Sequence, residues 1–453
     1  MTSPASPASP ATVQQPPGSA WAPFRHEAFA AMWGGQFVSN IGSWMQTVAA
    51  QWLMLALTGS AAYVAFIQTA ASLPVVLFAV LAGAIGDLVN RRKFLINAAT
   101  FLAVLGVLFW WHDTEPTRTL PREHVGEAIR AGGRYVAASP VLRVILLRAG
   151  LFVFFAASIW ALLPVAAQDR LHLGSGGYGL LLGCVGVGAV LGAVLLPRLR
   201  GRLGPGTLLT AGSIGLAGVA LILGFVPVTA LAAVALVVAG VAWILALSTL
   251  NSLYQLTLPQ WIKARGMSFY TIVFQGGNAV GSAVLGVSAQ HLGLSATLLV
   301  AAAGLALGPL AGLRYRFQVI PPDQFLPGAD WPVPNLADGV PGAGPVMVTV
   351  EYWPRPGQEA DLLAALRDAR FSRRRTGASA WRVWQDAADP ARILEQFVVA
   401  SWDEHIRQQD RVTVRDQQRY DQIRAMTDPA HPVTVTHWLT PPGPRNPGNT
   451  LPT

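Results

Sequence analysis

Long runs of apolar residues, separated by short polar segments, make up most of the chain up to about residue 313. A hydrocarbon layer about 30 Å thick needs roughly 20 apolar residues in helical form, and a helix satisfies its own backbone hydrogen bonds there. The pattern predicts a mainly α polytopic membrane bundle of about nine helices. They cover about Phe29–Leu57, Ala61–Ile85, Phe94–Trp111, Val141–Ala167, Tyr178–Leu196, Gly206–Phe225, Ala230–Leu256, Met267–Gln290 and Ser295–Leu313.

A different pattern follows the apolar runs. A Pro/Gly-rich stretch reads as an extended linker, and short alternating segments then indicate strands that are interleaved with helices. The order β-α-β-β-α-β is the ferredoxin-like one, so an α+β domain is predicted after the membrane part. Its elements are Val346–Trp353, Gln358–Thr376, Ala380–Asp386, Ile393–Trp402, Asp403–Met426 and Val433–Leu439.

These patterns divide the chain into seven parts. The Ala/Pro/Ser-rich start and the Pro-rich end lack apolar periodicity, so we expect them to be disordered. An amphipathic helix is expected over Arg122–Ala138, outside the bilayer. The parts are 1–24 (tail), 25–111 (partial first half of the bundle), 112–140 (central loop), 141–317 (six-helix second half), 318–345 (linker), 346–440 (ferredoxin-like domain) and 441–453 (tail).

Composition supports the membrane interpretation. Hydrophobic residues make up 52% of the chain and charged residues only 12%, with a mean hydropathy of +0.42, whereas soluble domains carry about 25% charged residues. The net charge of +9 raises the alternative of nucleic-acid binding. However, the basic residues lie mostly in short loops between apolar runs, where they set membrane orientation, so no nucleic-acid partner is predicted. The single cysteine, Cys184, excludes an intramolecular disulfide.

Basic residues alternate with uncharged loops along the second half. By the positive-inside rule the basic loops are cytoplasmic, which gives six crossings with both ends inside and places the C-terminal domain in the cytoplasm. Arg25 and His26 before the first run favour a cytoplasmic N-terminus. Basic residues flank the run Phe94–Trp111 on both sides, so the same rule places both of its ends in the cytoplasm. A helix that crosses the membrane once cannot have both ends on one side. The basic loop residues of the second half are Arg198, Arg200, Arg202, Lys263, Arg265, Arg314 and Arg316.

Polar and aromatic side chains inside the apolar runs are the candidates for a substrate path. Gln36 and Asn40 are spaced i, i+4 and share a helix face, and Arg148 is a charge well inside a run. Such groups face a wet cavity or form hydrogen bonds between helices, and the sequence leaves both alternatives open. The candidates are Gln36, Asn40, Trp44, Gln68, Arg148, Trp160, Tyr254, Gln275 and Asn278.

Catalytic chemistry has little support in the sequence. No Asp or Glu lies in the middle of an apolar run, and neither metal-ligand spacing nor a nucleophile–base set is visible. We therefore expect no catalytic residues, no metal and no cofactor, and the lipid bilayer and a small-molecule substrate as partners.

The connection after the second run carries a specific signature. Its residues resemble the loop motif that joins the second and third helices of major facilitator superfamily transporters on the cytoplasmic face, although Leu88 stands where that family has a basic residue. The motif residues are Gly83, Gly86, Asp87, Arg91 and Arg92.

Further phrases resemble the transmembrane secretion effector group of that superfamily. The resemblance implies proton-driven export of a small molecule such as a siderophore or drug, through the inner membrane of a bacterium. About three spans of the family pattern are missing between the loop motif and the central loop. The phrases are Trp33-Gly-Gly-Gln-Phe-Val-Ser-Asn-Ile-Gly42, Leu120-Pro-Arg-Glu123, Glu127-Ala-Ile-Arg130, Ser139-Pro-Val-Leu-Arg143 and Gly176-Gly-Tyr-Gly179.

The C-terminal domain resembles the small αβ domains of the antibiotic-biosynthesis monooxygenase type, which often pair through their sheets. This resemblance implies a homodimer through the domain. Because spans are missing, an alternative to export is a transport-deficient form whose C-terminal domain acts as a dimerisation or regulatory module, and a further alternative is a membrane-tethered monooxygenase-like enzyme. For the enzyme, four residues would line a pocket: Trp381, His405, His437 and Trp438.

Overall fold

The computed structural model describes residues 47, 50–55, 57–88, 125–309, 324, 326, 328 and 344–440. Several predictions lie outside these residues: both tails, the run Phe94–Trp111, most of the first run and of the linker, and the candidates Gln36, Asn40, Trp44, Arg91 and Arg92.

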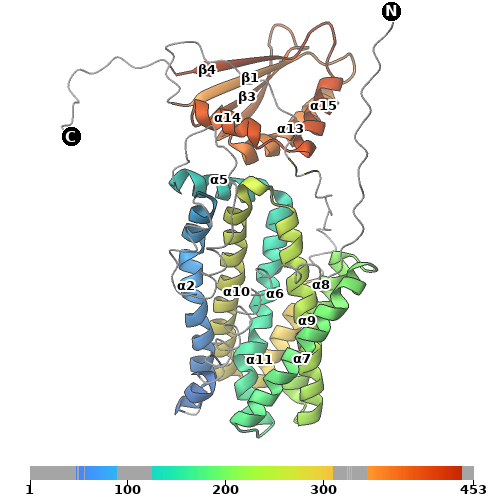
Figure 1. The fold of residues 1–453 in the computed structure, drawn as a ribbon. Coiled ribbons are helices and arrows are strands. Elements are labelled where there is room, and N and C mark those ends of the chain that lie inside the picture. The colour runs from blue at the N-terminus through green and yellow to red at the C-terminus, as the bar shows by residue number, and fades with distance from the viewer. Residues whose placement is uncertain are drawn as a thin grey trace, which may run out of the picture. The chain divides into compact units, whose positions relative to one another are not determined.

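The described part of the bundle consists of long helices that run side by side (Figure 1). Five are long and apolar enough to cross a membrane, and α11 and the described apolar part of α2 are shorter. The mainly helical membrane fold is thereby confirmed. The helices are α2 (Ala61–Leu88), α6 (Pro140–Val165) with a π-helical turn η2 (Ala166–Arg170), α7 (Ser175–Arg200), α8 (Pro205–Phe225), α9 (Thr229–Leu256), α10 (Lys263–Leu292) and α11 (Leu294–Leu307).

Glycine permits close approach at two helix crossings. A Cβ atom on Gly188 of α7 would collide with the carbonyl of Val237 on α9, and one on Gly240 of α9 would collide with the carbonyl of Val185 on α7. A Cβ on Gly286 of α10 would likewise collide with α2. Small residues at such crossings let backbones pack closely in membranes.

Helix α2 extends further than the sequence indicates. A turn is expected from Gly83 onwards, but the backbone remains helical to Leu88, so Gly83, Gly86 and Asp87 belong to the helix. Pro74 lies inside it without ending it.

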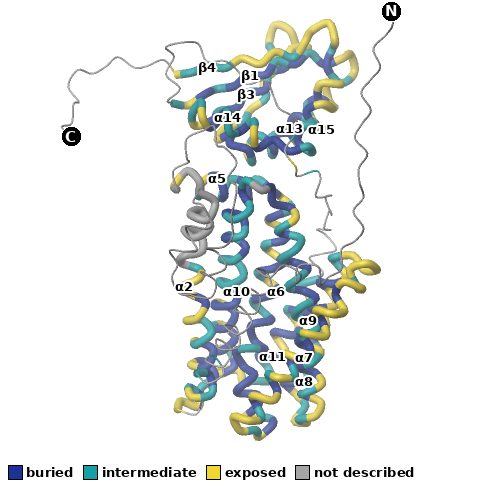
Figure 2. Tube along the Cα trace, in the orientation of Figure 1, coloured by how far each residue is buried: buried dark blue, intermediate teal, exposed yellow. Residues whose placement is uncertain are grey.

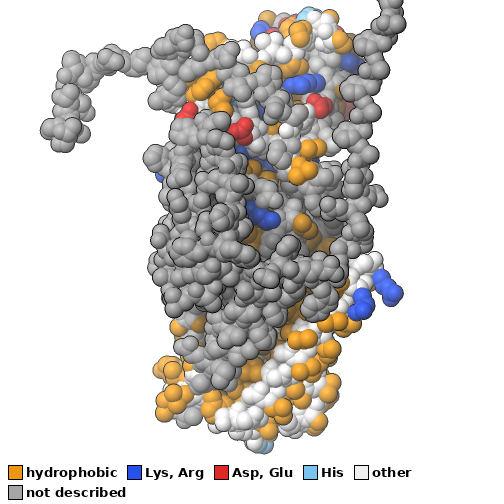
Figure 3. All heavy atoms as spheres, viewed as in Figure 1, with side chains coloured by type: hydrophobic (Ala, Val, Ile, Leu, Met, Phe, Trp, Pro, Cys, Tyr) orange, Lys and Arg blue, Asp and Glu red, His pale blue; other side chains and the backbone are white. Residues whose placement is uncertain are grey.

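Apolar side chains cover the outside of the bundle. Many Leu and Val residues of α7, α8, α9 and α10 are exposed, and exposed positions alternate with buried ones along these helices (Figure 2). Where the lower part of the described helices is visible in Figure 3, hydrophobic side chains are interspersed with backbone and other uncharged groups. An exposed apolar surface of this extent fits lipid as the solvent.

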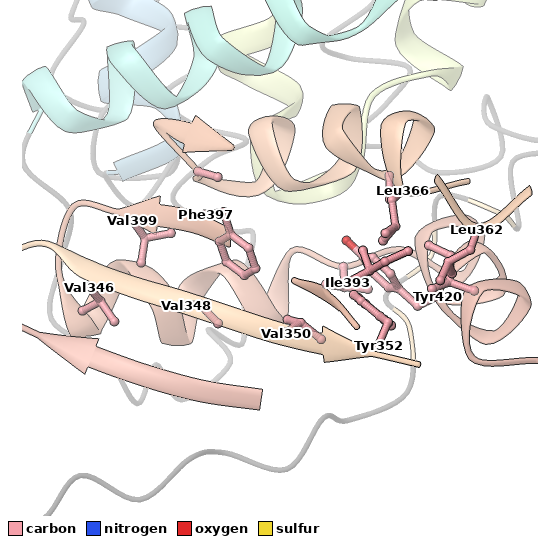
Figure 4. Packing of buried hydrophobic residues seen from close by; sticks show 14 residues of the cluster. Val346, Val348, Val350, Tyr352, Leu362, Leu366, Ile393, Phe397, Val399 and Tyr420 are labelled. Carbon is pink, nitrogen blue, oxygen red and sulfur yellow. The ribbon is translucent and has the colours of Figure 1, made fainter. Parts of the chain in front are cut away.

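The αβ domain is a four-stranded antiparallel sheet in the order β2-β3-β1-β4, as in ferredoxin-like folds. Alternate residues of β1 face a core with α13, and Val348, Leu366 and Phe397 are among its members (Figure 4). The elements are β1 (Val346–Tyr352), α13 (Glu359–Thr376), β2 (Ala380–Gln385), β3 (Ile393–Val399), α14 (Trp402–Asp410), α15 (Val414–Ala425) and β4 (Thr434–Leu439).

The single helix expected over Asp403–Met426 is wrong, because the chain forms two helices there. Thr413 caps α15: its hydroxyl accepts from the backbone N–H of Asp416 at 3.3 Å, and the Asp416 carboxylate accepts from the backbone N–H of Thr413 at 3.4 Å. This capping box stabilises a new helix start and ends the continuous pattern at Arg411.

Helix α5 (Val125–Ala138) contacts the αβ domain within the same compact unit. The Arg134 guanidinium lies 3.3 Å from the Glu404 carboxylate. The ring of Trp261, between α9 and α10, packs edge-on against Tyr135 and lies 4.6 Å from the guanidinium of Arg411.

Candidate functional site

Aromatic rings from three helices meet inside the second half of the bundle. Trp243 of α9 is central: its ring centroid lies 5.4 Å from Trp160 and 5.9 Å from Phe152, both on α6. Phe274 of α10 lies 6.1 Å away on another side. Edge-to-face packing at these separations is favourable for aromatic pairs, so the rings join α6, α9 and α10.

The series of rings continues along α10. Tyr270 stacks on Phe274, with centroids 6.1 Å apart, and Tyr254 of α9 lies 5.2 Å from Tyr270. The buried Tyr254 hydroxyl donates to the carbonyl of Gly266 at 3.0 Å. The buried Tyr270 hydroxyl has no hydrogen-bond partner among the described residues. We call these six rings, Phe152, Trp160, Trp243, Tyr254, Tyr270 and Phe274, the aromatic ladder.

Helical spacing explains how the ladder arises. Tyr270 and Phe274 lie four positions apart and Phe152 and Trp160 eight apart, so each pair shares one face of its helix. Trp243, Trp160 and Phe274 are only partly buried, so their rings retain surface for a further contact.

The chemistry of this region is uncharged. Between residues 140 and 309 the only carboxylate is that of Asp169, which follows α6 in the π-helical turn. The ladder itself offers ring faces, two indole N–H groups and two hydroxyl groups. Such a surface can bind a flat aromatic ligand by stacking, with the Tyr270 hydroxyl available for a hydrogen bond.

The structure separates the remaining candidates. Asn278 is buried and donates to the Ser72 hydroxyl of α2 at 3.1 Å, so it takes part in a hydrogen bond between helices. Gln275 is half-buried on α10 directly after Phe274, and Gln68 is half-buried on α2. Arg148 lines a cavity between α6, α8 and α11, which the ladder residue Phe152 also lines.

Glycines near the ladder contribute to packing. A Cβ on Gly277 would come within 2.6 Å of the Val153 side chain, and one on Gly281 would collide with the carbonyl of Phe154. Both contacts draw α10 against α6. Gly276 differs, because a Cβ there would meet nothing closer than Val76 at 4.0 Å.

Sequence reasoning missed four ladder residues, Phe152, Trp243, Tyr270 and Phe274. Their aromatic type at helical spacing was visible, but aromatic residues are also ordinary in apolar helices. Tyr178 was missed as well: its hydroxyl donates to the side-chain oxygen of Gln51 at 2.8 Å.

In the αβ domain the four residues considered for an enzyme pocket do not converge. Trp438 is exposed on the open face of the sheet and donates to the Thr349 hydroxyl, whereas His405 and His437 lie on the face covered by helices. Their Nε2 atoms are 2.9 Å apart. The expectation that all four line one pocket is therefore wrong, because neighbouring strand residues point to opposite faces.

Trp381 belongs to a buried ion pair. Its indole N–H donates to Glu395 at 2.9 Å, Arg373 donates twice to that carboxylate at 3.1 Å, and Tyr352 donates at 3.0 Å. Burial is the largest single influence and would raise the pKa of Glu395, but the charge of Arg373 together with the hydrogen bonds from Arg373, Trp381 and Tyr352 holds that pKa below its ordinary value. With its partners satisfied, this group is a structural element of the core.

Comparisons with known proteins agree with the bundle. A family model described as a transmembrane secretion effector matches residues 18–102 and 93–444. The enterobactin exporter of Citrobacter koseri is 29% identical over 239 residues, 50% of this chain and 55% of that protein. The enterobactin exporter of an Escherichia coli strain is 29% identical over 194 residues, 42% of this chain and 45% of that protein. The chain spans about half the length of the curated relatives it matches.

Proposed function

We propose that this chain, which belongs to the transmembrane secretion effector family of the major facilitators, exports a small aromatic molecule through the bacterial inner membrane. The family match and the exporters among its relatives support a role in efflux. The substrate class, the coupling ion and the orientation are our proposal.

The aromatic ladder carries the choice of substrate class. Its partly buried rings, the Tyr270 hydroxyl without a partner among the described residues and the single carboxylate between residues 140 and 309 favour a flat, aromatic and uncharged or anionic substrate. The relatives are enterobactin exporters, and we propose enterobactin or a siderophore like it as a substrate for this surface. Gln275 and Gln68 are proposed as polar contacts along the same path.

A proton gradient is the proposed energy source, and cytoplasmic termini follow from the arginine-rich loops. The family match divides into two segments that meet at residues 93–102, close to the start of the run before which about three family spans are expected to be missing. The transport test therefore uses the chain with its present sequence, without the missing spans.

The test is uptake of enterobactin into inverted membrane vesicles that carry the full chain and an imposed proton gradient. We expect Trp243→Ala to lower the uptake rate about tenfold, because loss of a stacking partner costs about 0.5–1.5 kcal/mol beyond the lost burial. Trp243→Phe should retain most of the rate. Phe225→Ala, at an exposed ring at the end of α8, is the matched control and should transport normally.

Two outcomes would contradict the proposal. Wild-type vesicles that take up no enterobactin with or without the gradient, at an expression level equal to that of an active exporter, would favour a transport-deficient form. Normal uptake by Trp243→Ala would remove the ladder from the substrate path.

For the αβ domain we propose assembly. On the open face of its sheet, Trp384 and Trp438 are 46% and 53% exposed. Met347 and Leu394 lie beside them and are partly exposed. Two such faces pack as a sandwich in many β proteins, which supports a homodimer. Light scattering of the detergent-solubilised chain should give a dimer, and Trp384→Glu with Trp438→Glu should give a monomer. Dimers that persist in this double variant would contradict pairing through the sheet.

A further inference from the structure

A cavity of about 490 Å³ lies between α6, α8 and α11, and Phe152 is the one ring of the aromatic ladder among its lining residues. Apolar side chains such as Leu151, Leu209 and Leu305 form part of its wall, and hydroxyl groups of Thr210 and Ser213 form another part. The cavity therefore offers both an apolar and a polar surface to one occupant.

The charge of the cavity has one sign. Arg148 is the only charged residue among the described residues that line it, and its side chain is only 8% exposed. A guanidinium in mostly apolar surroundings favours an anionic neighbour. Gly204 caps α8 without a side chain, and the first backbone N–H groups of α8, at Gly206 and Thr207 in the wall, add partial positive charge.

The mouth of the cavity opens on the outer surface of the bundle. Thr207 and Thr210 are exposed in the wall, and Ile214, one turn further along α8, is exposed and apolar. The cavity lies at the end of the bundle where α8 begins, close in sequence to Arg198 in the last turn of α7 and Arg202 in the loop that follows. Basic loops of this kind lie at the level of lipid headgroups.

We propose that this cavity binds the headgroup of an anionic phospholipid, with its phosphate near Arg148 and its acyl chains along the apolar outer surface of α8. The observations that favour a lipid over a soluble anion are the lateral mouth, the apolar wall and the position at the basic end of the bundle. The assignment does not depend on the transported substrate.

The test uses the purified full chain in nanodiscs of phosphatidylcholine that contain spin-labelled phosphatidylglycerol or, for comparison, spin-labelled phosphatidylcholine. Electron paramagnetic resonance measures the fraction of label immobilised by the protein. A favourable cation near the membrane surface adds about fivefold in lipid affinity, so we expect about a fivefold preference for phosphatidylglycerol. Arg148→Gln should reduce this preference to near one, and Arg148→Lys should preserve most of it.

Two further variants keep the test decisive. Arg143→Gln removes another arginine of α6 that does not line the cavity and should leave the preference unchanged. Ser213→Leu fills the cavity without removing charge and should abolish the preference, even if Arg148→Gln fails to fold. An unchanged preference in a folded Arg148→Gln or Ser213→Leu variant would overturn the proposal. Complete displacement of the label by millimolar inorganic phosphate would assign the cavity to a soluble anion.

Discussion

Acid should loosen the αβ domain through the pair formed by His405 and His437. Nδ1 of His405 lies 3.3 Å from the Gln408 side-chain oxygen, and its Nε2 lies 2.9 Å from Nε2 of His437. When Nδ1 donates to Gln408, Nε2 accepts the proton of His437, so the short contact has room for one proton. A second proton would place two N–H groups against each other.

The magnitude follows from the pKa. Burial lowers the pKa of His405 from 6.5 to about 4, and the neighbouring His437 adds to this effect; burial also lowers the pKa of His437. The unfolded chain therefore binds more protons than the folded one between these two values. The contribution of His405 to the free energy of unfolding is fully present above pH 6.5, declines as the pH falls, and reaches its lower limit below about pH 4. At pH 5, His405 alone destabilises the domain by about 2 kcal/mol, roughly 30-fold in the opening equilibrium.

Hydrogen–deuterium exchange of the β1 amides in the full chain measures this effect, after correction for the intrinsic pH dependence of exchange. We expect β1 to open about 30-fold more often at pH 5 than at pH 7.5. His405→Gln should remove most of the dependence because glutamine stays neutral. His431→Gln, at a half-exposed histidine of the same domain, is the control. An undiminished dependence in His405→Gln would refute the reasoning.

Three other substitutions test the packing. Gly240→Ala should destabilise the bundle by about 1–3 kcal/mol through overpacking, whereas Gly218→Ala, whose Cβ would meet nothing within 4 Å, should be neutral in thermal unfolding. Arg373→Met should cost about 3–5 kcal/mol because it leaves the Glu395 carboxylate buried and unpaired, and chemical denaturation should show partial recovery in the double variant with Glu395→Leu. Asn278→Ala should cost about 1 kcal/mol through its hydrogen bond to α2 yet leave enterobactin uptake within twofold of wild type.

The helices and strands were largely predictable because each depends on local pattern. The run Gly206–Phe225 became α8 almost residue for residue, since Gly204 and Pro205 mark its start. Alternation likewise identified β1. The break before Thr413 was also encoded locally, as a Thr-x-x-Asp capping box, but the apolar periodicity on both sides concealed it.

The sites were harder to predict because they depend on helix crossings. Nothing in the sequence tells which of the many apolar aromatic residues face one another. Trp243 was therefore not predicted as a site residue, although it is central to the ladder. The sequence made Asn278 a candidate for the substrate path, whereas in the structure it forms a hydrogen bond with Ser72 of α2. The contact of His405 with His437 joins a helix to a strand 32 positions away, which sequence spacing does not reveal.

The reciprocal contact of Gly188 and Gly240 limits how α7 and α9 can move relative to each other. Because each glycine receives a carbonyl of the opposite backbone, neither α7 nor α9 can slide or rotate past the other without a steric clash. In the export function proposed above, α7 and α9 would therefore move as one rigid body, and the displacement that opens and closes a pathway would be taken up at the other helix contacts of the bundle.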